Sequence, residues 1–542
     1  MSSSGALQRA KRLLYLFHRW AGIVLCLMLA LWFFSGFFMM YVDFPTQLRA
    51  ERLMGEAPLD AAAVRLSPAE AAAGLTAADF RIVGTPSRNE ERTEAPETPL
   101  AFRDVSLSSY LGRPAYTFTP DNGAQPRSVL ADTGEVVRDI DARLTVQAAT
   151  DFALRSGLIR PDEASRLRHR DVVQTDQWSV SSALNAHRPL HVIELGDEHS
   201  TVLYVSSRTG QVVRDTNARE RTLNYLGSVT HWIYPTVLRK YPDAWEWVVD
   251  ILSAVAAVMA IAGLWIAILR WRFKRRPGQS RIPYRGLMRW HYITGAIFGV
   301  IVVTWAFSGL LSLNPGNFNP SRTPTAAQKQ VFSGAPLPLE AYPIPAADSL
   351  PTDVRELKLT QYRGQPLWLA TLGDGDTRQV PVVPGANFDA PDVALLMKLA
   401  PGLMPGTAVA RQAVMTRYDD YYYSRHPERG EKPLPVLRVE FGDADRTWFH
   451  IDPATGQLLE RSTSTNRVFR WLYNGLHSLD IRWLWERRPL WDIVMIVLCG
   501  GGFALSVIGV IAGVRRLRFD LARARALRRQ SSAGNAALSN VK

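Results

Sequence analysis

The sequence predicts an integral membrane α-helical protein: four transmembrane helices that arise from an internal duplication, together with two external α+β domains. Two observations lead to this prediction. Four apolar stretches are long enough to cross a bilayer, which takes about 20 helical residues; they lie at 13–42, 244–269, 290–313 and 490–514. Two ungapped repeats, at offsets of 273 and 246 residues, relate one half of the chain to the other.

The first apolar stretch is expected to remain as a membrane anchor. It is about 30 residues long, whereas the apolar core of a signal peptide has roughly 7 to 15 residues. No small-residue cleavage pattern follows it promptly. The spans also contain both cysteines, Cys26 and Cys499, so the sequence predicts neither a disulfide framework nor a cysteine-based metal site in the external regions.

Positive charge is concentrated in three short segments outside the spans. Residues 1–12, the loop 270–289 and the tail from 515 together carry +18, whereas the whole chain carries +13, so the remainder carries −5. Because basic residues stay on the cytoplasmic side of a membrane, both termini and this loop are expected there, leaving 44–220 and 314–468 outside. The basic charge therefore reflects topology, and nucleic-acid binding is not expected.

Four histidines form two pairs that the repeats relate. The offset of 273 places His18 on His291, near the basic ends of the first and third spans. The offset of 246 places His231 on His477, and both precede a span on the external side. The same registers match further residues: Arg12 with Arg285, Gly22 with Gly295, Trp32 with Trp305, Phe34-Ser35-Gly36 with Phe307-Ser308-Gly309, Trp245 with Trp491 and Gly263 with Gly509.

Each external region is expected to form a small α+β domain. Residues 191–213 and 437–459 alternate like strands and turn at Thr-Gly steps. Segments 84–100 and 314–340 are rich in Pro, Ser, Thr and charge and show little periodicity. We therefore expect surface loops or linkers there.

An imidazole within a membrane must satisfy both ring nitrogens, and polar residues in that position are usually functional. A b-type haem meets this need, because neutral imidazoles bind its iron while the porphyrin buries apolar area between helices. We expect two such haems. His18 and His291 would hold one, and His231 and His477 the other, at opposite faces of the membrane.

Other matched residues have alternative roles. Gly22 and Gly295 lie four residues after the first histidine pair, on the same helical face, where a missing side chain would admit a flat ring. Trp32 and Trp305 would lie between the two haems or serve only as packing. Four matched arginines would bind haem propionates if they lie near the haems: Arg12, Arg285, Arg221 and Arg467. The alternative for Arg12 and Arg285 is that they act as cytoplasmic anchors.

An aromatic and basic sequence in the second external region is a candidate substrate site. Tyr421, Tyr422, Tyr423 and Arg425 would stack on or pair with an anionic iron chelate. The alternative is that they pack within strands and turns.

The strand-turn pattern that ends in Thr-Gly, set between histidine-bearing membrane segments, resembles the PepSY-associated transmembrane family. Four spans, two external domains and intramembrane histidines are similar to the inner-membrane siderophore reductases of the ferrioxamine B type. The resemblance covers nearly the whole chain. It implies two periplasmic PepSY-like α+β domains in a multi-pass protein of the bacterial inner membrane.

The expected organisation follows from the spans and this resemblance. It comprises a cytoplasmic N-terminus with the first span (1–43), periplasmic domain 1 (44–220), an outer His segment with the second span (221–273), a basic cytoplasmic loop (274–288), the third span (289–313), periplasmic domain 2 (314–466), an outer His segment with the fourth span (467–518) and a basic cytoplasmic tail (519–542).

The resemblance implies electron transfer to a periplasmic ferric siderophore. Reduction to Fe(II) weakens binding by hard oxygen ligands and so releases the iron. No G-x-G-x-x-G follows a strand, and the cytoplasmic segments are short, so nicotinamide or flavin is not expected. The expected partners are therefore the ferric siderophore, the lipid bilayer and a separate electron donor, either a quinol or a cytoplasmic reductase.

Two other classes of function remain open. One is a permease component built from repeats, although such transporters usually have inverted halves and broken helices. The other is a binding or regulatory membrane protein in which PepSY-like domains bind a partner and the histidines are structural. A visible spectrum with b-type bands would distinguish the haem hypothesis from both.

Overall fold

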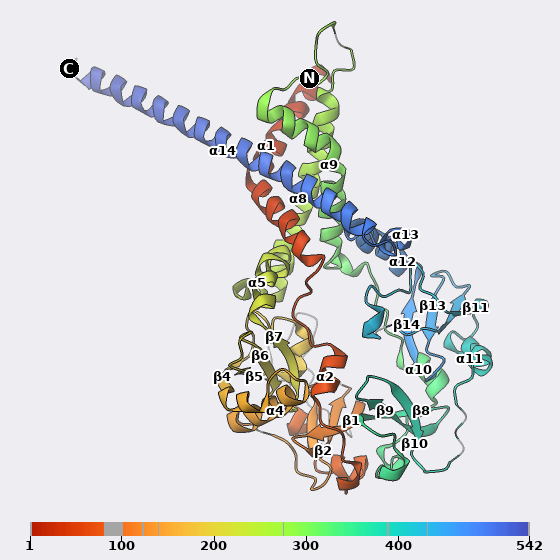
Figure 1. The fold of residues 1–542 in the computed structure, drawn as a ribbon. Helices are drawn as coiled ribbons and strands as arrows, with labels where there is room; N and C mark the ends of the chain where they lie inside the picture. Colours follow the sequence, from red (N-terminus) through yellow and green to blue (C-terminus); the bar gives the residue numbers. More distant parts are fainter. Residues whose placement is uncertain are drawn as a thin grey trace.

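The molecule has a bundle of long helices at one end and three β-sheets at the other (Figure 1). This computed structural model describes residues 3–539 apart from 81–100, 122–123, 139, 275, 387, 389 and 431. The linker expected at 84–100 lies outside the described residues. The N-terminus and the connection between the second and third long helices lie at the end of the bundle away from the sheets (Figure 1).

Four helices are long and apolar enough to cross a membrane, which confirms the four predicted spans. The chain is therefore a multi-pass membrane protein. The helices are α1 (Ser3–Met39), α8 (Pro242–Arg270), α9 (Gly286–Leu311) and α14 (Leu490–Ser539). Helix α14 continues well past its predicted apolar stretch, because the tail is rich in Arg, Leu and Ala, which all favour helix.

Helix α14 packs against both α1 and α9, and so does α8. Glycines on α14 allow this close approach. A Cβ added at Gly501 would lie 2.2 Å from the ring of Phe298 on α9, and one at Gly502 would lie 2.3 Å from the ring of Phe33 on α1. Small residues at helix contacts have this role in membranes, where close van der Waals packing replaces the hydrophobic effect.

The two external regions share one six-stranded antiparallel sheet, in the order β10-β9-β8-β1-β2-β3. Its central pair joins the halves of the chain: β1 pairs with β8 at Leu107 and Leu357. The strands are β1 (Phe102–Tyr110), β2 (Arg113–Pro120), β3 (Arg127–Leu130), β8 (Val354–Tyr362), β9 (Gln365–Leu372) and β10 (Thr377–Pro381).

Each half also has its own four-stranded antiparallel meander. The first consists of β4 (Arg168–Val173), β5 (Leu190–Glu194), β6 (Val202–Ser206) and β7 (Val212–Thr216), covered by α4 (Ala142–Arg155). The second consists of β11 (Val409–Met415), β12 (Val436–Phe441), β13 (Trp448–Ile451) and β14 (Leu458–Ser462), covered by α10 (Ala326–Ser333) and α11 (Val393–Leu399). Several antiparallel sheets with covering helices agree with the predicted α+β character of the external part.

One expected loop contains a helix. Helix α10 lies within 314–340, where low periodicity predicted a loop or linker. Its Phe332 is buried against the second meander. The short helix was hard to recognise because it contributes only this one deeply buried side chain.

Shorter helices connect the sheets to the bundle. They are α2 (Arg49–Gly55), α3 (Pro68–Ala72), α5 (Ala218–Leu226), α6 (Ser228–His231), α7 (Thr236–Arg239), α12 (Ser464–Arg470) and α13 (Arg482–Trp485). A π-helical turn, Trp471–Gly475, follows α12 directly. Segments α5–α7 and α12–α13 lead from the meanders into α8 and α14 (Figure 1).

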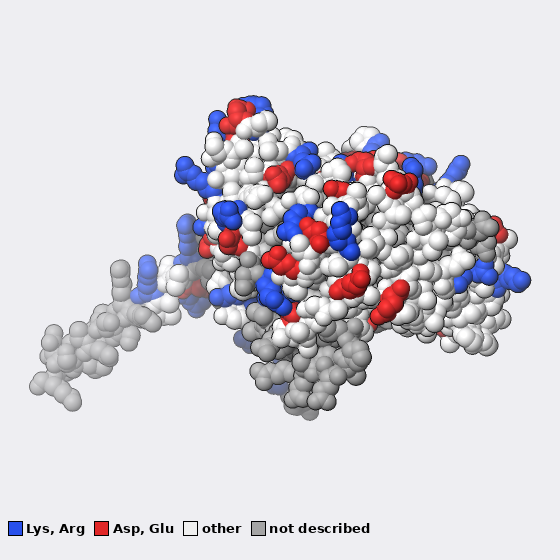
Figure 2. Space-filling model, turned by 90° about the horizontal axis from the view of Figure 1, so that it is seen from below, with Lys and Arg blue, Asp and Glu red and all other residues white. Residues whose placement is uncertain are grey.

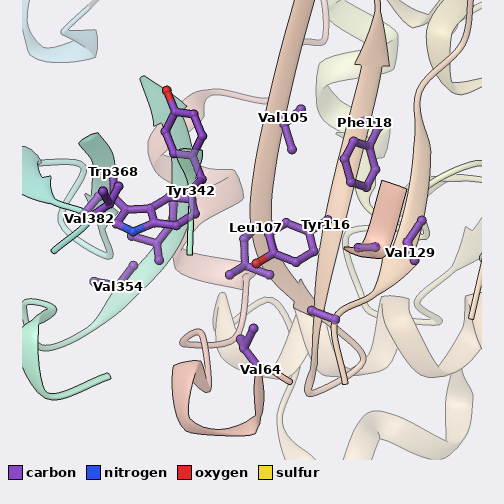
Figure 3. Packing of buried hydrophobic residues seen from close by; sticks show 14 of the residues in the cluster. Val64, Val105, Leu107, Tyr116, Phe118, Val129, Tyr342, Val354, Trp368 and Val382 are labelled. Atoms are coloured by element: carbon purple, nitrogen blue, oxygen red, sulfur yellow. The ribbon is translucent and has the colours of Figure 1, made fainter. Parts of the chain in front are cut away.

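The shared sheet has a hydrophobic core drawn from both halves (Figure 3). Leu107, Tyr116 and Phe118 come from the first half, and Tyr342 and Trp368 from the second. All five are at most 4% exposed. The core therefore makes the two external regions one folding unit rather than two independent ones.

The surface at the sheet end carries Lys and Arg interspersed with Asp and Glu (Figure 2). No continuous basic surface is drawn on this face (Figure 2). This agrees with the concentration of positive charge in the three segments outside the external regions.

Truncating Trp368 to Ala should destabilise the strands of both halves together, by about 3 to 5 kcal/mol, because it removes a buried indole from their common core. Hydrogen exchange of the full chain in detergent would measure this loss, with faster exchange in β1–β3 as well as in β8–β10. The exposed Val172→Ala on β4 is the control and should change little. Unchanged exchange in β1–β3 would show that the halves unfold independently.

Candidate functional site

The structure brings His18 on α1 together with His291 on α9. Their ring centres are 6.3 Å apart, and the ring planes are inclined by 45°. Both side chains line a cavity of about 450 Å³ that lies between the four long helices. We call it the inner cavity, because it lies toward the end of the bundle away from the sheets.

The ring of His18 is held by backbone. Its Nδ1 lies 3.0 Å from the carbonyl oxygen of Met259 on α8. A carbonyl can only accept, so Nδ1 carries the proton and Nε2 keeps its lone pair. The Nδ1 atom of His291 is buried and has no hydrogen-bond partner among the described residues.

Glycines make room for this inner pair. Gly22 and Gly295, the two predicted from the sequence, both line the inner cavity. A second matched pair has a closer contact: a Cβ at Gly263 would lie 2.6 Å from Cε1 of His18, and one at Gly509 would lie 3.8 Å from Cε1 of His291. The absence of a side chain at 263 is thus required by the position of the His18 ring.

The structure also brings His231, the last residue of α6, together with His477, which follows the π-helical turn. Their ring centres are 6.0 Å apart, with the planes at 78°. Both line a second cavity of about 440 Å³, the outer cavity, which is nearer the sheets. Such π-helical turns are frequent at functional sites.

Matched serines hold the outer rings. The Nδ1 atom of His231 lies 3.1 Å from Oγ of Ser35, and Nδ1 of His477 lies 3.0 Å from Oγ of Ser308. Ser35 donates its only hydroxyl proton to the Trp32 carbonyl, and Ser308 donates to that of Trp305. Each hydroxyl must therefore accept from Nδ1–H, which leaves both Nε2 atoms as free bases.

In both halves, an indole hydrogen bond also holds the backbone that follows the outer histidine. Trp245 donates its indole N–H to the carbonyl of Trp232, at 2.9 Å, and Trp491 donates to that of Ser478, at 3.0 Å. The next residues, Ile233 and Leu479, have left-handed φ angles of 53° and 49°. A non-glycine residue there is strained by about 1 to 3 kcal/mol, which the surrounding contacts must offset.

The separations of the rings suit two imidazoles on opposite sides of one metal ion. A bond from a metal to an imidazole nitrogen is about 2.0 to 2.1 Å, and the ring centre lies about 1.1 Å farther, so opposed ring centres are roughly 6.2 to 6.4 Å apart. The inner pair, at 6.3 Å, falls within this range, and the outer pair, at 6.0 Å, is slightly closer than it. No group of three or more His, Cys, Asp or Glu side chains in the described part of the chain is placed to hold a metal ion.

The two cavities adjoin one another. Leu29 on α1 and Val302 on α9, which the 273-residue offset relates, line both. Trp32 and Trp305 line the outer cavity beside this partition, and their buried indole N–H groups have no partner among the described residues. The Trp305 ring lies 6.4 Å from that of His477. The two sites therefore share part of their apolar lining.

The arginines at the cavities are not those the repeats suggested. Arg19 and Arg516 line the inner cavity, and Arg425 lines the outer one. Arg221 and Arg467 instead bind strand and loop carbonyls, those of Thr216 and Ser200 in the first half and of Ser462 and Arg446 in the second. Arg12 and Arg285 are not among the residues that line either cavity.

The tyrosine sequence is only partly exposed, as the packing alternative expects, and the substrate-site hypothesis stays a prediction. Tyr422 is only 1% exposed and stacks on His450, with ring centres 4.6 Å apart. Tyr423 donates to Asp480 at 2.7 Å, and Tyr421 accepts from Trp471. Arg425 pairs with Asp480, so it is the member of this sequence that reaches the outer cavity.

A charged network fixes the base of this segment. Arg438 donates to Nε2 of His450 at 2.9 Å, and Nδ1 of His450 lies 3.2 Å from Glu460. Lys432 lies 2.8 Å from the other carboxylate oxygen of Glu460. Burial opposes the charge on Glu460, but His450 and Lys432 more than compensate and lower its pKa to about 2. The network holds Tyr422, and with it the segment that carries Arg425.

Sequence reasoning found the four histidines but missed the residues that position them. Ser35 and Ser308 were visible only as part of a repeated Phe-Ser-Gly. Trp245 and Trp491 were visible as a matched pair. Their repetition was the available signal, but the contacts they make depend on which helices face one another.

Comparison with known families gives one result. The family described as the PepSY-associated TM region matches residues 15–380. This match contains His18, His231 and His291 and ends before His477. A comparison with curated proteins gives no match.

Replacing Glu460 with Gln should reduce stability at pH 7 by about 3 kcal/mol, because it leaves Lys432 and His450 without their carboxylate. The folded-state pKa lies below the ordinary 4.5, so the stabilisation is present above pH 4.5 and is lost as pH falls toward 2. Thermal unfolding across pH 2 to 7 would measure both effects. The exposed Glu194→Gln is the control; equal acid sensitivity in Glu460→Gln and wild type would refute the assignment.

Proposed function

The chain belongs to the family of the PepSY-associated TM region, and on this premise we propose that it is a haem-containing oxidoreductase that passes electrons across the bacterial inner membrane to a ferric siderophore in the periplasm. The geometry of the two histidine pairs carries the proposal. Each pair lies in a largely apolar cavity within the helix bundle, with its rings spaced for a shared metal ion.

The ligand set fits b-type haem better than a bare metal ion. Each pair offers two imidazole nitrogens, whereas a structural zinc site needs four ligands. Haem iron already has four porphyrin nitrogens and needs only axial ligands. His18 and His291 would hold one haem, and His231 and His477 the other. When bound, haem supplies the one-electron chemistry of its iron.

The chain itself prepares the ligands. The Met259 carbonyl and the hydroxyls of Ser35 and Ser308 hold three Nδ1–H groups, so the Nε2 atoms of these rings are unprotonated. Such partners orient a ligating histidine and raise its basicity. The cavity walls are mainly apolar, and Gly22 and Gly295 leave space beside the inner pair.

Arginines at the cavity walls suit the carboxylates of a porphyrin. Arg19 and Arg516 would hold them at the inner cavity and Arg425 at the outer cavity, through charge-assisted hydrogen bonds. The Nε atom of Arg19 is buried and has no hydrogen-bond partner among the described residues. This atom is a donor that a bound carboxylate would satisfy.

The acceptor step is the reduction of Fe(III) in the chelate to Fe(II) by one electron. Fe(II) binds hard oxygen ligands more weakly, so the siderophore releases it intact. The electron comes from a separate donor, a quinol or a cytoplasmic reductase. The four spans are continuous helices rather than broken ones, which favours this proposal over a permease.

The purified protein should contain two b-type haems per chain, and His477→Ala should contain one. Pyridine haemochrome analysis gives the count, and the visible spectrum gives the haem type. In proteoliposomes with the donor inside, the wild type should reduce an external ferric chelate, and His477→Ala should do so at least about 100-fold more slowly, since loss of even an outer-shell partner costs 10- to 100-fold. A wild-type preparation without haem would refute the proposal.

Ser308→Ala separates orientation of the ligand from ligation itself. It removes the Nδ1 partner of His477 but keeps the imidazole, so the protein should retain two haems with roughly 10- to 100-fold weaker binding at the outer site. The matched control is Ser506→Ala, since Ser506 donates to the Gly502 carbonyl of its own helix and lines the inner cavity rather than the outer one. Equal haem affinity in both variants would contradict the role of Ser308.

Topology provides a further test of direction. Reporter tags at residue 280 and at the C-terminus should report the cytoplasm, and tags near 90 and 330 the periplasm, because the basic segments stay inside. Alkaline phosphatase and green fluorescent protein fusions distinguish the two sides. The reverse pattern would place the outer cavity in the cytoplasm and exclude a periplasmic acceptor.

A further inference from the structure

Each outer histidine is followed by a short segment that leads into the next span. We call the two segments the outer hooks: residues 232–241, which contain α7, and 478–489, which contain α13. The repeat of 246 residues places α7 on α13. Figure 1 places α13 where the bundle meets the sheets.

Both hooks expose large apolar side chains. In the first, Val237 is 71% exposed and Tyr241 is 58% exposed. In the second, Trp483 is 59% exposed. The exposure continues onto the first turns of the adjoining spans, at Trp247 of α8 and Ile493 of α14. The hooks are therefore continuous with helices that are apolar enough to cross the membrane.

Cations lie over the aromatic rings of both hooks and of the spans that follow them. Lys240 lies 5.1 Å from the ring centre of Tyr241, and Arg487 lies 5.0 Å from that of Trp483. The same arrangement occurs at the starts of α8 and α14. Arg239 lies 4.6 Å from the ring centre of Trp245, and Arg488 lies 4.4 Å from that of Trp491. Each hook thus combines an exposed apolar body with a positive charge.

We propose that both outer hooks lie in the membrane interface and bind the lipid surface, with the apolar side chains toward the acyl chains and the cations among the headgroup phosphates. Trp and Tyr are enriched at this level of a bilayer, and Lys and Arg extend from it toward water. The same chemistry occurs in both halves, and both copies adjoin a span. A lipid surface surrounds the spans, so it would contact both hooks at the same time.

This placement sets the depth of the outer histidine pair. His231 and His477 each lie five residues before the first residue of α7 or α13, and the contacts of Trp245 and Trp491 tie the intervening turns to the spans. The hooks would therefore keep the outer cavity just within the membrane. The inference does not depend on the proposed haems.

Site-directed spin labelling of the full chain in lipid vesicles tests the placement. Nitroxides are attached at Val237→Cys and Trp483→Cys, and accessibility to oxygen and to a water-soluble nickel chelate is measured. The native Cys26 and Cys499 are buried, and wild-type protein treated with the same nitroxide reagent verifies that they do not react. The controls are Val172→Cys on the external strand β4 and Val258→Cys, exposed in the middle of α8.

The oxygen-to-nickel ratio at both hook positions should be several-fold above that at Val172 and several-fold below that at Val258. A ratio like that of Val172 at either position would place that hook in water and overturn the proposal. A ratio like that of Val258 would place it in the hydrocarbon core, with the same consequence. Low accessibility to both reagents would show that protein, rather than lipid, covers the hook.

Discussion

The organisation of this protein depends on the need of four half-buried imidazoles in the helix bundle to satisfy both ring nitrogens. A polar group without a partner is costly in an apolar interior. For three of the rings the chain itself supplies a partner for Nδ1. The partners are the Met259 carbonyl and the hydroxyls of Ser35 and Ser308. These contacts fix the tautomer of three rings, and the two histidines of each pair line one cavity. The helix arrangement and the space between the rings follow from that requirement.

The same contacts occur in both halves, which explains how paired histidines end up in paired positions. Arg221 and Arg467 bind carbonyls at equivalent places, and so tie the end of each meander to the helix that follows it. Trp245 and Trp491 then bind the carbonyl immediately after each outer histidine. The position of each ring is therefore determined by a chain of contacts that begins in the external sheet. The sheets and the membrane helices form one mechanical unit.

The spans and the histidine pairs could be predicted because their signals are local or repeated. A run of about 20 apolar residues is visible without knowledge of the fold, and His231 and His477 stand out because the register repeats. The pairing of β1 with β8 could not be predicted, since antiparallel partners far apart in sequence leave no local signal beyond alternation. Two separate external domains were expected, whereas the structure has a shared sheet.

Side-chain roles were harder to predict than positions. A serine in a membrane helix usually bonds to its own backbone, and Ser35 does so as well, so its second contact with His231 has no sequence signature. The sequence left two alternatives for Tyr422, a substrate contact or packing. Its burial against His450 could not be read from the run of tyrosines, because it depends on contacts with a distant strand.

The differences between the halves are as informative as the matches. The histidines occupy equivalent positions in the two halves, but the residues of the cavity walls differ. At the inner cavity Arg19 matches Tyr292 in position, and at the outer cavity Ser253 matches Cys499. A porphyrin has the same asymmetry, since its nitrogens are arranged symmetrically about the iron while its carboxylates lie on one edge. If a porphyrin binds, the matched histidines would hold it, and the unmatched arginines Arg19 at the inner cavity and Arg425 at the outer cavity would favour one orientation of its carboxylates. The features that the repeats match are thus the histidines and their partners, whereas the features that differ are the cavity walls, which would set the direction of any bound ring.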